Sequence, residues 1–152
     1  MNINITKTKE MIVGANVNPP SQLTFSDETI ERVFVYKLLG VLIDNNLKWD
    51  NHIDSICSKA SSRLHFLIQL KRNGATVEDM VRFYETVIRS VLEYACPAWH
   101  SSLSVEQSSR IESIQRRSSK FIYGSTSHYE TYVMITHIRR YLTVVTFYVD
   151  DC

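Results

Sequence analysis

Two adjacent aspartates near the end of the sequence are the residues best suited, by type and spacing, to metal chemistry. Asp150 and Asp151 follow Tyr148 and Val149 directly, and paired carboxylates can hold the Mg²⁺ ions that assist phosphoryl transfer. Only Cys152 follows them, so we expect a solvated acid pair rather than a metal site.

A second candidate is His52-Ile53-Asp54, whose His-x-Asp spacing supplies two ligands of the facial triad in Fe(II) oxygenases. His128 or His137 could supply the third ligand, and Arg139 or Arg140 could bind the carboxylate of 2-oxoglutarate. Such triads lie on a double-stranded β-helix, which requires about eight strands. The residues around His52 and Asp54 instead have a helical period. The sequence therefore predicts no metal site and no cofactor.

The cysteines indicate an intracellular protein, cytoplasmic or nuclear. Cys57, Cys96 and Cys152 are odd in number and lack CxxC spacing, which argues against disulfides and a zinc knuckle. Cys96 and His100 lie in a turn that Pro97 marks as a helix end, and two ligands are too few for structural zinc. We expect buried, reduced thiols.

Basic side chains gather on one side of a predicted helix. At about 100° per residue, this side consists of Arg110, Arg116, Arg117 and Lys120. The opposite side consists of Ile111, Ile114, Phe121 and Ile122. The chain has 17 Lys and Arg against 16 Asp and Glu, so attraction to nucleic acid must come from such a local patch. A second, weaker group consists of Lys59, Arg63, Lys71 and Arg72.

The elements that must position these residues divide by hydrophobic period. Residues 1–48 contain the strand signals, which we interpret as a short antiparallel β-hairpin region. The predicted strands are Met11–Val13, Leu23–Phe25, Thr29–Val33 and Phe34–Ile43. Gly40 inside the last of them predicts a bulge or a close backbone approach.

Residues 49–124 have a helical period. A first helix begins near Asp50 and ends before Gly74, and a second begins at Thr76 and is stopped by Pro97. A third begins at the capping box of Ser104 and Gln107 and runs to Tyr123. Residues 125–152 form a divergent tail in which 132–142 could be a fourth helix. The predicted fold class is α+β, with a three- to four-helix thumb-like bundle.

Composition supports a folded chain: of 152 residues, 44% are hydrophobic and 22% charged. No stretch reaches the roughly 20 apolar residues of a membrane span, and the first residues do not resemble a signal peptide. Apolar residues of the hairpin region predict self-association if they are exposed.

Read in order, these segments resemble the region downstream of the catalytic aspartates in LINE-type, non-LTR retrotransposon reverse transcriptases. The matching stretches are Asn4–Met11, Val35–Asp44, Leu47–Trp49, His52-Ile53, Arg63–Leu67 and Phe83–Tyr94. The first is similar to motif D, with Lys7 and Lys9 in its lysine run. The second is similar to the motif E hairpin that grips the primer end, with Leu39, Gly40 and Val41 at its centre. The remainder is similar to the helical thumb.

This resemblance implies ancestry and fold rather than polymerisation, because the family's metal-binding aspartates precede motif D. The aromatic-x-Asp-Asp signature of Tyr148–Asp151 stands after the thumb, which is the wrong order. We therefore predict a catalytically incomplete segment with no catalytic residue of its own. Its predicted partners are RNA or an RNA/DNA duplex, bound without sequence preference through the basic helix.

Two alternatives stay open at this point. Thumb-like segments of this type can be grouped with the N-terminal part of an AlkB homologue, which would suggest Fe(II)/2-oxoglutarate dioxygenase or methyltransferase chemistry. The chain could also be a relic of a transposable element without a function.

Overall fold

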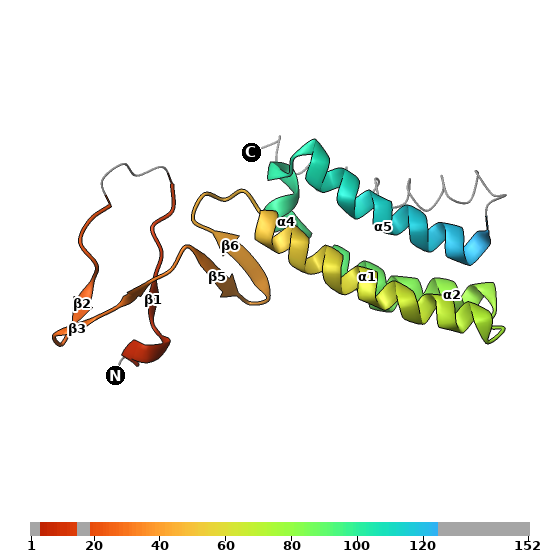
Figure 1. The fold of residues 1–152 in the computed structure, drawn as a ribbon, viewed down its shortest axis with the longest axis horizontal. Helices are drawn as coiled ribbons and strands as arrows, with labels where there is room; N and C mark the ends of the chain where they lie inside the picture. The colour runs from red at the N-terminus through yellow and green to blue at the C-terminus, as the bar shows by residue number, and fades with distance from the viewer. Residues whose placement is uncertain (1–3, 15–18, 125–152) are drawn as a thin grey trace. The chain divides into compact units, whose positions relative to one another are not determined.

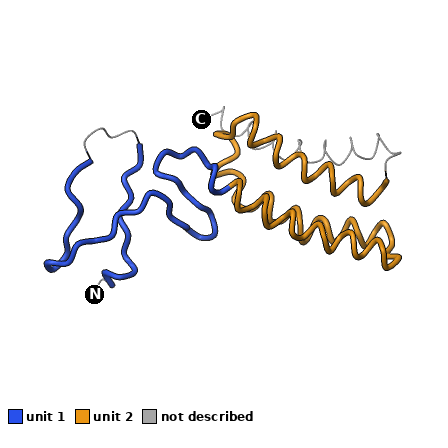
Figure 2. The backbone as a smooth tube through the Cα atoms, in the orientation of Figure 1, with its two compact units in different colours: residues 1–52 blue, residues 53–152 orange. Residues whose placement is uncertain are grey.

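The computed structural model describes residues 4–14 and 19–124. Strands come first and helices follow, which confirms the α+β class (Figure 1). Contacts within the chain define unit 1, Met1–His52, and unit 2, Ile53–Cys152 (Figure 2). The predicted tail lies outside the described residues, and with it the fourth helix, the acid pair, His128, His137, Arg139, Arg140 and Cys152.

Unit 1 begins with a 3₁₀ turn, η1 (Ile5–Lys7), followed by β1 (Lys9–Glu10). Its other strands are β2 (Thr24–Phe25), β3 (Glu28–Thr29), β4 (Glu31–Arg32), β5 (Val35–Leu38) and β6 (Val41–Asp44). The pairs β2–β3 and β5–β6 are antiparallel, as predicted, but β1 and β4 pair in parallel. The expectation that Met11–Val13 forms a strand is wrong, because β1 ends at Glu10.

Opposite charges explain the parallel pairing of β1 with β4. Lys9 lies opposite Glu31 and Glu10 lies opposite Arg32 in the strand register. Both pairs form ion pairs, Lys9 with Glu31 and Arg32 Nη2 with Glu10 Oε1 at 3.0 Å. Cross-strand partners of opposite charge stabilise a short ladder that has little apolar area to bury.

The hairpin β5–β6 turns through two residues of positive φ. Leu39 has φ 47° and Gly40 has φ 91°, and Leu38 lies opposite Val41. This is the type I′ arrangement, whose twist matches that of the strands it joins. The bulge predicted at Gly40 is therefore wrong: the glycine forms the turn.

Unit 2 begins within helix α1 (Asp50–Arg72), whose apolar stripe is buried as predicted. Its buried members are Ile53, Ile56, Cys57, Ala60, Leu64 and Leu67. Gly74 follows with φ 78°, and the amide of Ala75 donates to the carbonyl of Leu70 at 3.0 Å. A left-handed glycine closes the helix here, as the sequence indicated.

The second helix is not regular. Thr76 caps α2 (Val77–Phe83) by accepting from the amide of Asp79 at 3.2 Å, and a π-helical segment, η2 (Tyr84–Arg89), leads into α3 (Ser90–Leu92). The buried side chains are Met80, Tyr84, Ile88 and Leu92. In an α-helix, side chains four residues apart differ in direction by about 40° around the helix axis, so a series spaced by four gradually leaves one side. A π turn bonds residue i to residue i+5 and contains more residues per turn. It therefore keeps these four buried side chains on the same side of the helix.

Pro97 begins a helix rather than ending one. The second helix stops at Leu92, Ala95 has φ 53°, and Pro97 lies in the first turn of α4 (Cys96–Trp99). Proline suits that position because the first amides of a helix have no internal acceptor. Trp99 is fully buried, and its indole donates to the carbonyl of Tyr94 at 3.1 Å.

A 3₁₀ turn, η3 (His100–Ser102), leads to helix α5 (Val105–Tyr123). Both bonds of the predicted capping box form: Gln107 N donates to Ser104 Oγ at 3.2 Å, and Ser104 N donates to Gln107 Oε1 at 2.9 Å. Gly124 follows with φ 83°. Among the described residues, no helix has the length and apolar character needed to cross a membrane.

Candidate nucleic-acid interface

The basic side of α5 faces solvent, but its four cations differ in what they contact. Arg110 pairs with Asp54 of α1, and Arg116 pairs with Glu112 one turn earlier at 2.7 Å. Arg117 and Lys120 are exposed, and within residues 4–14 and 19–124 neither has an ion-pair partner. Arg116, with a side chain 62% exposed, joins these two in what we call the α5 basic face.

Arg110 is a link between helices more than a free cation. Its guanidinium donates to the carboxylate of Asp54, which raises the pKa of Arg110 above its usual value. Their side chains are 41% and 60% exposed, so the pair is screened and contributes about 0.2–1 kcal/mol. Arg110 therefore stands apart from the α5 basic face.

The opposite side of α5 is more polar than the sequence indicated. Ile114 and Ile122 are buried as predicted, whereas Ile111 and Phe121 are only half-buried. The other buried residues of the helix are Gln107, Gln115, Ser118 and Ser119. Ser118 Oγ donates to the carbonyl of Ile114 at 2.9 Å, which satisfies the hydroxyl inside the helix. Because serine side chains are small, they allow neighbouring helices to approach this side of α5 closely. Their burial could have been predicted from their position on the helix, although not from their polarity.

Two members of the weaker basic group hold helices together. Lys71 Nζ donates to the carbonyl of Phe121 at 2.6 Å, and Arg63 donates to the carbonyl of Val87 in the π-helical segment. Lys59 and Arg72 are exposed. The contact made by Lys71 fixes the C-terminal end of α5, so the α5 basic face is carried by an anchored helix.

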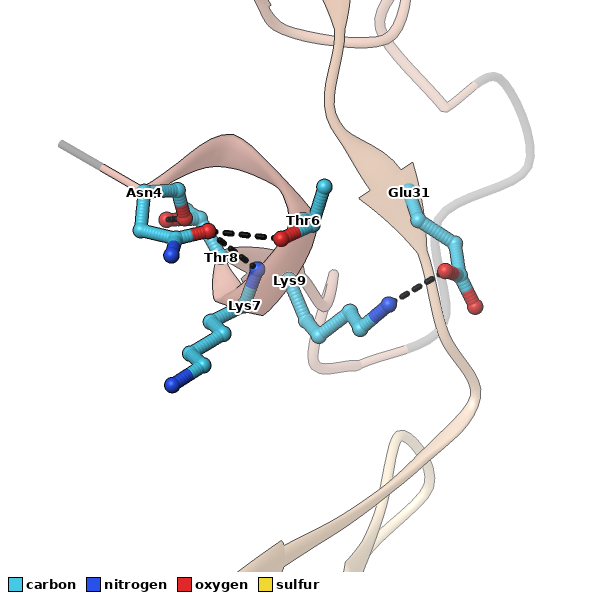
Figure 3. A network of polar contacts seen from close by, with 6 residues as sticks. All are labelled: Asn4, Thr6, Lys7, Thr8, Lys9 and Glu31. Atoms are coloured by element: carbon cyan, nitrogen blue, oxygen red, sulfur yellow. Dashed lines mark hydrogen bonds and ion pairs between the residues drawn. The ribbon is translucent and has the colours of Figure 1, made fainter.

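The motif D-like lysines also differ from each other (Figure 3). The Asn4 side chain caps η1, accepting from Thr6 Oγ1 at 2.6 Å and from the Lys7 amide at 3.3 Å. The Lys9 ammonium is engaged by Glu31. The side chain of Lys7 is exposed and extends away from these contacts.

At the primer-grip-like hairpin, Leu39 is 83% exposed whereas Val41 is buried. The apolar neighbours with exposed side chains are Phe34, Val35, Tyr36 and Leu38. Exposed apolar side chains of this kind are the condition under which self-association was predicted. Self-association through them remains a prediction.

The His-x-Asp candidate has the wrong geometry for chelation. His52 and Asp54 both lie near the N-terminal end of α1, and residues two apart in a helix point in directions about 160° apart. His52 is 1% exposed and its Nδ1 accepts from the amide of Leu42 at 3.3 Å, while the Asp54 side chain is 60% exposed and binds Arg110. Among the described residues, no three His, Cys, Asp or Glu side chains form a group able to hold a metal ion.

Cys57 is buried and Cys96 is half-buried. Burial raises the pKa of Cys57 above its usual value and raises the pKa of Cys96 to about 11. A thiol of high pKa is a weak nucleophile near neutral pH, so neither cysteine is suited to act as a nucleophile.

Comparison with known proteins gives two partial similarities. The family described as "Alkylated DNA repair protein alkB homolog 8, N-terminal" matches residues 49–90, in line with the expected grouping. The chain is also 21% identical over 146 residues to "Probable RNA-directed DNA polymerase from transposon X-element" of Drosophila melanogaster. That alignment includes 95% of this chain and 16% of the relative, so the chain spans a small part of the relative's length. No solved structure matches.

Proposed function

We propose that this chain corresponds to the palm-end and thumb segment of a non-LTR reverse transcriptase and that it holds a nucleic-acid duplex without reading its sequence. Support comes from the order of the motif-like segments and from the similarity to a transposon polymerase along nearly all of the chain. In this proposal the segment supplies binding, and the polymerisation chemistry belongs to other parts of a larger protein.

The observation that carries the proposal is the α5 basic face. Arg116, Arg117 and Lys120 are exposed on one side of a helix whose other side is buried. Among the described residues, the one ion pair made by this face joins Arg116 to Glu112. Cations presented by an anchored helix can contact phosphates in succession, and phosphate contacts give affinity without sequence preference.

The similarity to the alkB homolog 8 N-terminal family covers α1, α2 and the whole π-helical segment. In this proposal those helices are the scaffold beneath α5. An iron-dependent oxygenase does not follow from the match, because His52 is buried while Asp54 is bound to Arg110.

Binding of the full chain to an RNA/DNA primer–template tests the proposal. We expect an affinity that falls as salt rises, and an Arg117→Gln/Lys120→Gln variant with an affinity about tenfold lower and a log–log salt slope smaller by about 2. The charge-matched control is Arg72→Gln/Arg82→Gln, which changes two exposed cations of α1 and α2. Binding that is independent of salt, or an equal loss in the control, overturns the proposal.

A further inference from the structure

A groove in unit 2 lies between α1 and the second helix, with a volume of about 560 Å³. It opens to solvent and uses no residue of the α5 basic face. Its α1 side is lined by Arg63, Phe66, Gln69, Leu70 and Asn73, and its other side by Phe83, Thr86 and Val87.

The lining has a distinctive chemistry. Phe66 is 58% exposed, which is unusual for a large aromatic side chain, and a second aromatic residue, Phe83, lines the same groove. Among the described residues that line the groove, Arg63 is the one charged side chain. Gln69 and Asn73 add side-chain amide groups to the lining.

The π-helical segment shapes the second wall and fixes the cation. Thr86 and Val87 belong to η2, and Arg63 donates from α1 to the carbonyl of Val87. One guanidinium nitrogen of Arg63 is thus hydrogen-bonded to the second wall of the groove. This bond holds the guanidinium in place, and the remaining N–H donors of this five-donor group are left for a ligand. Interruptions of this kind in α-helices occur frequently at functional sites.

We propose that this groove binds single-stranded nucleic acid, with a nucleobase stacked on Phe66 and a phosphate near Arg63. Every base has a π face that an exposed aromatic ring can cover, and amide side chains can bond to base edges. The positive lining without an acid favours an anionic ligand over a neutral apolar peptide. The inference goes beyond duplex binding and stands without it, because the two surfaces share no residue.

Three variants of the full chain separate stacking from apolar contact. A fluorescently labelled short oligoadenylate RNA serves as the probe, followed by anisotropy. Phe66→Leu keeps apolar volume but removes the aromatic face, so we expect about tenfold weaker binding. Phe66→Trp keeps the stacking surface and should bind at least as well as the native chain. Phe25→Leu, at an exposed aromatic position of β2, is the control and should bind normally.

Several results overturn the inference: Phe66→Leu binding like the native chain, Phe25→Leu losing as much as Phe66→Leu, or Phe66→Trp losing as much as Phe66→Leu. Circular dichroism checks that each variant folds. We expect the Phe66 variants to fold because the Phe66 side chain is largely exposed. Duplex binding should not respond to Phe66→Leu, because paired bases are already stacked. Failure of this site is therefore distinct from failure of the α5 basic face.

Discussion

Arg110 on α5 forms an ion pair with Asp54, which lies 56 residues earlier, near the N-terminal end of α1. The pair connects two helices of unit 2, and it also places a negative charge beside the side of α5 that would meet phosphates. Arg110, which the sequence analysis assigned to nucleic-acid binding, therefore connects two helices in the structure.

Asp54→Asn should therefore strengthen duplex binding. The change releases the Arg110 guanidinium and removes one local negative charge, so we expect a several-fold higher affinity at low salt and a log–log salt slope larger by about 1. Urea unfolding should show a loss of only about 0.2–1 kcal/mol, because both side chains are partly exposed. Unchanged binding in the variant would argue against phosphates passing near Arg110.

The ion pair of Glu10 with Arg32 predicts a dependence of stability on pH in unit 1. The Arg32 guanidinium holds the pKa of Glu10 below its usual value. As pH falls, the unfolded chain therefore takes up this proton before the folded chain does. The stabilisation is complete above the unfolded pKa of about 4.3 and is lost as pH falls through the folded pKa.

Glu10→Gln should remove that part of the pH dependence. Amide hydrogen exchange of β1 and β4 measures it, compared between neutral and acidic pH. Glu28→Gln, at an exposed position of β3, is the control and should keep the native pH profile. A Glu10→Gln profile that matches the native one would show that Arg32 does not govern this titration.

The capping box of α5 predicts the effect of a single hydroxyl. Ser104→Ala removes the acceptor of the Gln107 amide, and loss of such a cap costs about 1 kcal/mol. Ser109→Ala, on the exposed side of the same helix, should be neutral or slightly stabilising because alanine favours helices. Urea unfolding of unit 2 distinguishes the two, and equal midpoints would contradict the role of the cap.

These helix ends were the part of the fold most accessible from sequence. Thr76, Ser104 and Gly74 act through bonds to backbone within a few residues, so local chemistry determines them. The parallel pairing of β1 with β4 was missed because strands of two residues carry no period, and their register depends on charges about 22 residues apart.

The π-helical segment and the candidate sites were less accessible for a related reason. Tyr84 and Ile88 follow Met80 at intervals of four, a pattern that ordinary helices also show, so the wider turn depends on packing. The basic residues could be assigned to one side of α5, but the partners of Arg110 and Arg63 come from distant helices. Sequence spacing predicts which side a residue occupies, and tertiary contacts decide whether it is free to bind.

The raised pKa of the half-buried Cys96 predicts slow chemical modification. With a pKa of about 11, Cys96 has a thiolate fraction of about 0.1% at pH 8. In a Cys152→Ser background, labelling by a disulfide reagent should be slow at pH 8 and should accelerate about tenfold per pH unit below that pKa. An added Ser61→Cys, at an exposed position of α1, supplies a fast reference. Labelling of Cys96 as fast as that reference would contradict its burial.

The turn of the β5–β6 hairpin carries a leucine where the backbone favours another residue. Leu39 has φ 47° and is 83% exposed, a conformation and an exposure that both disfavour a large apolar side chain. Asn-Gly is the preferred pair in a type I′ turn, so Leu39→Asn should stabilise the hairpin by about 1 kcal/mol. Slower amide exchange in β5 and β6 would measure this gain.

If the hairpin contacts the primer end, as the motif E-like sequence suggests, Leu39→Asn should weaken primer–template binding although it stabilises the fold. Gly40→Ala is the matched variant: at φ 91° it should destabilise the same turn while leaving the Leu39 side chain in place. Weaker binding in Leu39→Asn, with a more protected hairpin, would separate contact from stability. Stronger protection of the hairpin amides with unchanged primer–template binding would show that the hairpin does not contact the nucleic acid. Binding would then depend on the α5 basic face alone.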